Sequence, residues 1–526
     1  MSMNAQGRPT AAGSSESTET PTFTGNRGLQ IEESLIFEKD AFAGTGVDFV
    51  APSGTADRLG KLKRTTNIGL PGLSEPAAMR HYVRLSQKNY AIDAGPFPLG
   101  SCTMKHNPRL NEKVARLAGF ADIHPLQPQS TVPGALELID TLAHWLKEMT
   151  GMPAVAMSPK AGAHGELCGM MAIKAAIDAR GEGDVRTRVL APESAHGTNP
   201  ATAAQCGFKV EDIPADATGR VDLKVFKEML GPDIAGIMVT NPNTCGLFER
   251  DIREIADAVH EAGGYFYCDG ANLNAIACKA RPGDLGVDAM HINLHKTFST
   301  PHGGGGPGSG PTVLSAALAP FAPVPYVARE GDAYHLVETR RAAKAEAEGD
   351  KSFGRMTAFH GQMGMFVRAL SYMMSHGADG IKQAAEDAVL NANYVQAMLR
   401  QEMTTAFDGF CMHEALFDDQ WLQGTGVETL DFAKAMIDEG YHPMTMYFPL
   451  VVHGAMLIEP TESESKQELD LFCGALLSLA KKAKSGDADM FKSAPHFAPR
   501  RRLDETAAAR KPVLRWKPEE PAKAAE

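Results

Sequence analysis

Residues 234–246 read IAGIMVTNPNTCG, residues 265–272 read YFYCDGAN, and residues 289–297 read AMHINLHKT. Each stretch opens with a near-continuous apolar run and ends in polar or small side chains. We predict strands at Ile234–Thr240, Tyr265–Asp269 and Ala289–Leu294. A helical pattern, Ile252–Ala262, separates the first two runs. Buried strands that alternate with crossover helices are typical of a mostly parallel sheet covered on both faces. We therefore predict an α/β fold.

The same alternation extends upstream to residue 154. We predict further strands at Ala154–Met157, Arg188–Ala191 and Phe208–Ile213, and helices at Gly165–Arg180, Ala201–Cys206 and Asp222–Leu230. Downstream, helical periodicity at Met373–Arg400 and near Glu468–Lys482 flanks a β-like run, Thr445–Val452. The predicted domains are a disordered leader (1–28), an N-terminal arm (29–95), a large domain (96–330), a smaller C-terminal α/β domain (331–498) and a tail (499–526).

The composition is that of an acidic globular enzyme. Of the 526 residues, 43% are hydrophobic, and 52 Lys and Arg against 64 Asp and Glu give a net charge of −12. These values exclude collagen, a wholly disordered chain and a disulfide scaffold, and they argue against nucleic-acid or membrane-surface partners. No apolar stretch approaches the roughly 18–20 residues that span a membrane. The eight cysteines form no CxxC pair, so we expect no structural metal site, reduced thiols and a cytoplasmic location.

Two titratable groups stand at the ends of predicted strands. In mostly parallel sheets, functional groups collect beyond the carboxyl ends of the strands, so Asp269 and Lys296 are expected at one site. An aspartate and a lysine in this arrangement suit pyridoxal phosphate (PLP). The lysine amine bonds to the cofactor aldehyde, and the carboxylate keeps the ring nitrogen protonated. We therefore predict a PLP site.

Other strand ends supply candidate cofactor contacts. Gly162, Ala163 and His164, at a strand-to-helix turn, offer backbone N–H groups and a helix dipole to the phosphate. The remaining candidates contact the ring or flank the lysine: Asn241 for the ring oxygen, His196 and Ala271 for the two ring faces, and Thr297 beside Lys296. Each feature taken alone has an ordinary structural explanation, since either histidine suits a packed structure and Asp-Gly suits a tight turn. Their succession at consecutive strand ends favours a site.

Several long motifs carry a family resemblance. They are PLGSCTMKHNP (98–108), HPLQPQS (124–130), SAHGTNPATA (194–203), CDGANLNAI (268–276), INLHKTFSTPHGGGGPGSGP (292–311), YFPLVV (447–452), IEPTESES (458–465) and RRLDETAAARKPVLRW (501–516). On these stretches the chain resembles the glycine decarboxylase of the glycine cleavage system, the P-protein, in its subunit 2 form. Two motifs depart from the usual pattern: KHNP replaces KYNP at 105–108, and AGAHGE replaces SGAQGE at 161–166. Both changes keep the backbone donors.

The resemblance implies a fold-type-I PLP enzyme with Lys296 as the cofactor lysine. It also implies a glycine dehydrogenase (aminomethyl-transferring), an oxidoreductase acting on the CH–NH2 group with a disulfide acceptor. This enzyme decarboxylates glycine and passes the aminomethyl group to the lipoyl arm of the H-protein. The implied partner is subunit 1, in an α2β2 heterotetramer. His295 and His302 are candidate proton-transfer groups because imidazole titrates near neutral pH, although both equally suit a role in stabilising the loop.

Three other readings stay open at this point. Glycine hydroxymethyltransferases and aminotransferases of the same fold also place a lysine after a strand. A non-catalytic scaffold does not need the Asp269–Lys296 pair, and a phosphate-binding regulatory module leaves both residues unexplained. The substrate carboxylate needs a cation or amide donors, for which Arg355 is a candidate that no neighbouring residue supports.

Overall fold

The computed structural model describes residues 33–39, 59–66, 69–303, 308–339, 351–498 and 501–517. The predicted leader at 1–28 and residues 304–307 of the glycine tract lie outside them. The described residues fall into two compact units, one of them formed by Ile92–Met436 and Tyr441–Ala488 and the other by the segments before, between and after these. The predicted domain boundaries remain a proposal.

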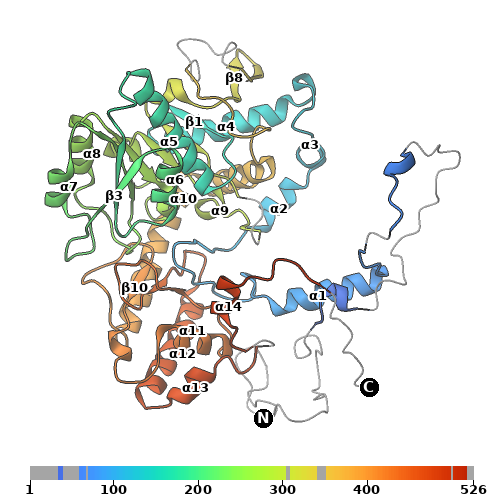
Figure 1. Cartoon of the computed structure of the whole chain (residues 1–526), viewed down its shortest axis with the longest axis vertical. Helices are drawn as coiled ribbons and strands as arrows, with labels where there is room; N and C mark the ends of the chain where they lie inside the picture. The colour runs from blue at the N-terminus through green and yellow to red at the C-terminus, as the bar shows by residue number, and fades with distance from the viewer. Residues whose placement is uncertain are drawn as a thin grey trace. The chain divides into compact units, whose positions relative to one another are not determined.

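A mostly parallel sheet organises the larger unit (Figure 1). In the described residues it has seven strands in the order β1-β7-β6-β5-β4-β2-β3. The strands are β1 (Ala154–Ala156), β2 (Arg188–Pro192), β3 (Lys209–Ile213), β4 (Ile234–Thr240), β5 (Tyr265–Asp269), β6 (Ala289–His291) and β7 (Thr312–Leu314). Strand β7 runs antiparallel to both of its neighbours, and every other pair is parallel. This arrangement confirms the predicted α/β fold.

Helices cover both faces of this sheet. They are α4 (Pro133–Thr150), α5 (Gly162–Ala179), α6 (Thr198–Gln205), α7 (Leu223–Met229) and α8 (Ile252–Glu261). Met238 packs in the cluster that holds Ile173 of α5, whereas its neighbour Val239 packs in the cluster that holds Leu142 of α4 and Ile255 of α8. Successive side chains of a strand point to opposite faces, so one buried strand contributes to both cores.

A second, antiparallel sheet follows in the larger unit. Its strands among the described residues are β10 (Ala415–Phe417), β12 (Met456–Ile458) and β11 (Thr445–Met446), in that order. A hairpin, β8 (Tyr326–Glu330) and β9 (Ala333–Val337), precedes it. The remaining helices are α2 (Arg109–Ala115), α3 (Ala118–Ala121), α9 (Leu294–Thr297), α10 (Met363–Leu399), α11 (Thr429–Asp438), α12 (Lys466–Lys484) and α13 (Ala488–Ser493). No helix among the residues described has the length and apolar character needed to cross a membrane.

The smaller unit contains α1 (Glu75–Lys88), α13 from Asp489 onward, and α14 (Glu505–Arg510). Glu33 forms ion pairs with Lys39 and with His81 of α1. Phe37 stacks on Trp516, with ring centroids 5.0 Å apart. Contacts between segments distant in the sequence therefore hold this unit together.

Several elements differ from the sequence prediction. The strand predicted at Ala289–Leu294 ends at His291, because Asn293 begins the helical turn α9 and its carbonyl accepts from Lys296 N. Helices α5 and α6 each begin three residues earlier than predicted. The β-like run Thr445–Val452 is a strand only at Thr445–Met446, because the backbone of Tyr447 turns into the left-handed region (φ 56°).

Candidate active site

A cavity of about 210 Å³ lies where β4, β5 and β6 end. Its lining includes these predicted site residues: Gly162, Ala163, His196, Asp269, Ala271, His295 and Lys296. The other lining residues are Ser101, Glu166, Thr198, Thr240, Thr244, Asn272, His291 and Asn293. Residues far apart in the chain thus meet at one edge of the sheet.

Four predicted site residues do not line this cavity. The ring of His164 turns back and accepts a hydrogen bond from the backbone N–H of Lys160 (3.1 Å). Asn241 uses its side-chain oxygen to accept from a backbone N–H eight residues later (3.0 Å). Thr297 is buried. The ring of His302 packs against the ring of His295, which lines the cavity. Their predicted roles stay predictions.

Asp269 is buried at the end of β5 and carries a firmly held carboxylate. Its oxygens accept from Asn199 Nδ2 and from the backbone N–H of Ala271, both at 2.9 Å. Burial by itself would raise the pKa of Asp269. His291, these two hydrogen bonds and the charge of Lys296 outweigh burial and lower that pKa. Asp269 is therefore ionised at neutral pH.

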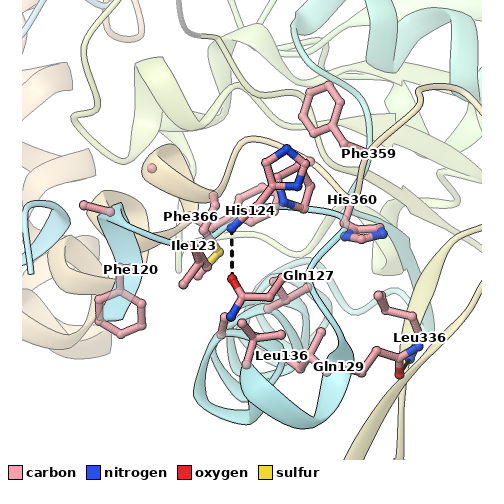
Figure 2. Close-up of a pocket in the computed structure, with 18 of the residues that line it drawn as sticks. Phe120, Ile123, His124, Gln127, Gln129, Leu136, Leu336, Phe359, His360 and Phe366 are labelled. Carbon is pink, nitrogen blue, oxygen red and sulfur yellow. Dashed lines mark hydrogen bonds between the residues drawn. The ribbon is translucent and has the colours of Figure 1, made fainter. Parts of the chain in front are cut away.

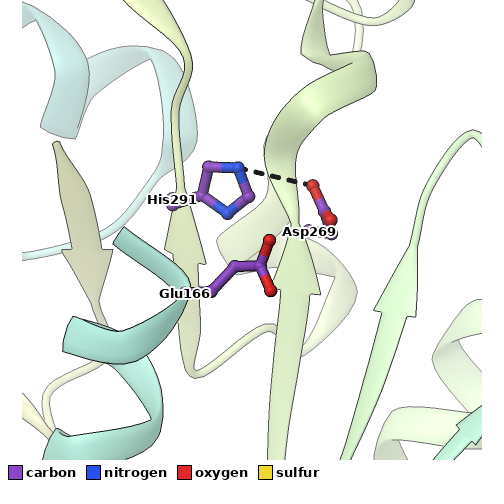
Figure 3. Close-up of side chains that lie close together, drawn as sticks. All are labelled: Glu166, Asp269 and His291. Carbon is purple, nitrogen blue, oxygen red and sulfur yellow. Dashed lines mark ion pairs between the residues drawn. The ribbon is translucent and has the colours of Figure 1, made fainter. Parts of the chain in front are cut away.

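A ring nitrogen of His291 faces the carboxylate of Asp269 (Figure 3). Its Nε2 lies 3.4 Å from Asp269 Oδ1, and its Nδ1 lies 2.6 Å from the hydroxyl of Tyr267. Burial raises the pKa of Tyr267 well above its usual value, so the phenol keeps its proton. Because the ionised Asp269 can only accept, it favours a proton on Nε2, and Nδ1 then accepts from the Tyr267 hydroxyl. Burial also lowers the pKa of His291. The ring is thus neutral and has its proton on Nε2, facing the carboxylate.

Glu166 of α5 lies beside this pair. Its carboxyl group accepts from Thr198 Oγ1 (2.8 Å) and Asn199 Nδ2 (3.0 Å). Burial, followed by the charge of Asp269, raises the pKa of Glu166 to about 7. Two adjacent carboxylates in a buried site resist ionising together. The cluster therefore contains one ionised acid, Asp269, and one acid, Glu166, that changes its protonation state near neutral pH.

Lys296 enters the cavity from α9, the helical turn after β6. Its Nζ donates to the carbonyl oxygen of Ser101 at 2.7 Å. Lys296 and Asp269 line the same cavity, so a single small ligand can reach both.

His295 and His302 lie edge to face beside the lysine. Their ring centroids are 5.1 Å apart. Burial, the neighbouring His302 and Lys296 lower the pKa of His295 to about 3, and burial with Lys296 lowers that of His302 to about 4. Both rings are therefore neutral across the physiological range.

The N-terminus of α5 faces the cavity. No side chain in the described part of the chain caps this helix. The first N–H groups of a helix have no partner within the helix, and together with the helix dipole they bind anions. Nearby, Asn293 Oδ1 and Thr240 Oγ1 are buried without a hydrogen-bond partner among the described residues. The cavity thus offers anion donors and unpaired polar groups to a ligand.

A second cavity, of about 290 Å³, lies elsewhere in the larger unit (Figure 2). Residues from α3, α4 and α10 line it, along with His124, Gln127 and Gln129 of the HPLQPQS motif. The backbone N–H of His124 donates to Gln127 Oε1 (3.3 Å). None of its lining residues also lines the Lys296 cavity. This motif therefore shapes a separate, largely apolar cavity.

Comparison with known sequences decides the family. The chain is 67% identical over 521 residues, 98% of both chains, to "Probable glycine dehydrogenase (decarboxylating) subunit 2" of Caulobacter vibrioides. The chain belongs to the glycine dehydrogenase (decarboxylating) subunit 2 family. A family member of the same name from Caldanaerobacter subterraneus is 48% identical, over 93% of this chain and 99% of its own. The resemblance drawn from the motifs is thereby confirmed.

Family profiles and solved structures agree with this membership. The profile for the C-terminal domain of glycine dehydrogenase matches residues 384–498, and that for aminotransferase class-V matches 179–306. An inhibitor-bound glycine decarboxylase (P-protein) of the glycine cleavage system aligns with a TM-score of 0.66 at 20% identity, covering 80% of this chain and 92% of its own. A TDC from Oryza sativa with PLP and tryptamine aligns with a TM-score of 0.61 at 13% identity, covering 84% and 94%. The fold is that of fold-type-I PLP enzymes.

The residues of the subunit 2 cavity fit the cofactor of this fold. PLP needs an amine for its aldehyde, a carboxylate for its ring nitrogen and donors for its phosphate. Lys296, the ionised Asp269 and the uncapped N-terminus of α5 offer these three groups in one cavity. The unpaired oxygens of Asn293 and Thr240 leave polar partners for the rest of the ring.

The sequence analysis did not identify His291 and Glu166 as residues of this site. His291 fell inside a predicted strand that was three residues too long, although it ends β6 as Asp269 ends β5. A tighter strand boundary would have marked it as a strand-end residue. Glu166 lies within a helix, and its contact with Asn199 joins residues 33 positions apart. No local pattern signals that contact.

Glu166→Gln should alter how the stability of the cofactor-free chain depends on pH. A carboxyl group whose folded pKa is raised from 4.5 to about 7 stabilises the folded state less as pH rises between these values. The full effect is about 3 kcal/mol, and glutamine abolishes it. Relative to the wild type, the melting temperature of Glu166→Gln should therefore rise by a few degrees between pH 5 and pH 8. Parallel melting curves over this range would contradict the raised pKa.

Proposed function

We propose that this chain decarboxylates glycine and transfers the residual aminomethyl group to the lipoyl arm of an H-protein. It would be the PLP-carrying half of a two-subunit glycine dehydrogenase. The observation that supports this most is the joint presence of Lys296 and Asp269 in one cavity of a chain from the subunit 2 family.

Each part of the cavity would have a distinct task. PLP, when bound, supplies an aldehyde for a lysine amine and a ring that takes up the electron pair left by the departing carboxylate. Lys296 would hold the cofactor, Asp269 would lie against its ring nitrogen, and Gly162 and Ala163 would donate to its phosphate. His196 and Ala271 would flank the ring.

The electrostatics of the chain suit this chemistry. The hydrogen bonds to Asp269 keep its carboxylate charged in a buried site, where a charge acts more strongly than in water. His291 Nε2–H holds the carboxylate from one side without adding a positive charge. The protein thereby favours a protonated ring nitrogen.

Of the two candidate histidines, His295 contacts the cavity. Its ring lines the site beside Lys296, whereas His302 lies behind it. We therefore place His295, rather than His302, at the proton-transfer position, and His302 would fix the His295 ring. The pKa of His295 is lowered to about 3, so its ring is neutral at physiological pH and would act by accepting a proton, not by titrating near neutral pH as a free imidazole does. Arg355 donates to Glu338 (3.1 Å) and does not line the cavity.

The family name implies a subunit 1, and an α2β2 assembly is our proposal for the pair. Transfer to a lipoyl arm requires the H-protein to dock over the cavity, which has an exposed wall at His196.

Gly162→Ala should weaken cofactor binding. A Cβ at this position would lie 2.7 Å from Asn293 Oδ1 and 3.2 Å from His291 Nε2, so the cradle at the start of α5 would have to open. We expect the Kd for PLP, measured by absorbance titration, to rise at least about tenfold. Gly134→Ala, where a Cβ meets nothing within 4 Å, is the matched control. Equal PLP affinity in the two variants would argue against this phosphate site.

The proposed function is tested by exchange of labelled bicarbonate into the carboxyl group of glycine. The assay uses this chain co-purified with subunit 1 and lipoyl H-protein, and each component is omitted in turn. Exchange that depends on this chain and on the H-protein supports the proposal. Tetrahydrofolate-dependent serine formation or transamination without H-protein would instead identify a hydroxymethyltransferase or an aminotransferase. The absence of a cofactor absorption band would identify a non-catalytic subunit.

A further inference from the structure

The loop Ser101–Thr103 has an unusual backbone. Ser101 and Thr103 both adopt left-handed conformations, with φ of 63° and 47°. Residues with a side chain seldom do so, and such a conformation persists only where surrounding contacts hold it. The contacts around this loop therefore show what keeps it in this conformation.

Two buried glutamates accept hydrogen bonds from backbone N–H groups of the loop. The backbone N–H of Ser101 donates to Glu414 Oε2 at 2.8 Å. The N–H of Thr103 donates to Glu459 Oε2 at 2.8 Å, and its hydroxyl donates to Glu459 Oε1 at 2.6 Å. Both glutamates are fully buried, with 0% exposure. Each unusual residue thus has its own carboxyl partner.

The second sheet places the two glutamates side by side. Ala415 of β10 pairs with Ile458 of β12, so Glu414 and Glu459 occupy the next position of the same antiparallel ladder. The segment before the loop also lies on β12. Leu99 bridges to Ile458, and a Cβ on Gly100 would come within 2.4 Å of the Leu457 side chain. Loop and glutamates therefore share one rigid support.

The loop in turn presents an acceptor to the candidate cofactor lysine. The carbonyl oxygen of Ser101 accepts from Lys296 Nζ at 2.7 Å, and Ser101 lines the cavity. Whenever substrate displaces the lysine from the cofactor, the freed amine needs a fixed partner. This carbonyl is the partner that the structure shows.

We propose that Glu414 and Glu459 are positioning residues that hold Ser101–Thr103 so that the Ser101 carbonyl receives the free amine of Lys296. The inference rests on the proposed role of Lys296 as the cofactor lysine. Neither glutamate lines the cavity, so each acts through other residues. The loop is the contact that the two glutamates share, and Glu414 also accepts from Nδ2 of the lining residue Asn272 at 3.4 Å.

We expect Glu414 to hold the loop through the hydrogen bond that it accepts, and not through a negative charge. Burial, followed by the adjacent Glu459, raises the pKa of Glu414 well above its usual value, so its carboxyl group is a neutral acceptor at physiological pH. Glutamine keeps an acceptor oxygen in this position, and methionine does not. Glu414→Gln should therefore preserve the loop, and Glu414→Met should release it.

The test measures two properties of the purified chain. One is the rate at which an N-hydroxysuccinimide acetyl ester modifies Lys296 in the cofactor-free chain, followed by peptide mass spectrometry. The other is PLP affinity by absorbance titration. For Glu414→Met and Glu459→Met we expect Lys296 to react at least fivefold faster and PLP to bind at least tenfold more weakly. For Glu414→Gln we expect both values to stay within twofold of the wild type.

Asp288→Leu is the matched control. Asp288 is a buried carboxylate that accepts from the backbone N–H of Phe266 (2.8 Å), and it does not line the cavity. Its loss should lower the melting temperature and leave both readouts unchanged. If the methionine variants do not fold, Thr103→Val removes one bond to Glu459 and should raise the Lys296 reaction rate by two- to threefold.

Two results would overturn the inference. In one, the methionine variants, or Thr103→Val in their place, match the wild type in both readouts. In the other, Glu414→Gln is as defective as Glu414→Met, which would make charge the essential property. Failure of the proposed role of Lys296 looks different, because the wild-type chain would then take up no PLP or would bind it through another lysine.

Discussion

Lys296→Ala should abolish the cofactor absorption band of the chain and lower bicarbonate exchange at least about 1,000-fold. Among the described residues, Lys296 is the one lysine that lines the cavity, so alanine leaves no amine there for the cofactor aldehyde. PLP would then bind only through its phosphate and ring contacts. Absorbance spectra taken before and after gel filtration measure how much cofactor each protein retains.

Lys160→Ala is the control for the lysine variant. Lys160 is exposed near the start of α5, and it does not line the cavity. Its replacement should leave both the absorption band and the exchange rate close to the wild type. A Lys296→Ala protein that keeps the band after gel filtration would mean that another lysine carries the cofactor.

Asp269→Asn should keep part of the cofactor but lower turnover by about 100- to 1,000-fold. Asparagine is nearly isosteric and can still accept from the N–H of Ala271. It carries no charge, so it cannot stabilise a protonated ring nitrogen in this buried site. Exchange rates measured at saturating PLP separate the electronic effect from weaker binding.

Asp288→Asn serves as the control for Asp269. It removes a buried aspartate charge near the opposite end of β6. We expect Asp288→Asn to leave turnover unaffected. Near-normal turnover in Asp269→Asn would remove the electronic role assigned to this residue.

Much of the fold was predictable because its central strands are continuous apolar runs. The predicted strands Ile234–Thr240 and Tyr265–Asp269 coincide with β4 and β5. Strand β7 was not predicted, because it has three residues and closely follows the glycine tract. Short strands gain their stability from neighbours in the sheet, which a local pattern does not contain.

The candidate site was predictable only in part, for a related reason. Asp269 and Lys296 stand at the ends of predicted strands. Because the carboxyl ends of parallel strands meet at one edge of a sheet, their proximity could be predicted from the sequence. The partners that set their chemistry come from other elements: Glu166 from within a helix, and Glu414 and Glu459 from a sheet built more than 100 residues later. Contacts of this kind depend on the folded chain, and no spacing in the sequence encodes them.

Reduction with borohydride followed by peptide mapping tests the central claim most directly. The chain is loaded with PLP, reduced to fix the bond between lysine and cofactor, digested, and sequenced by mass spectrometry. Our account predicts a single pyridoxyl-phosphate adduct, located on Lys296. An adduct on a different lysine, or none at all in a chain that is fully folded, would contradict it.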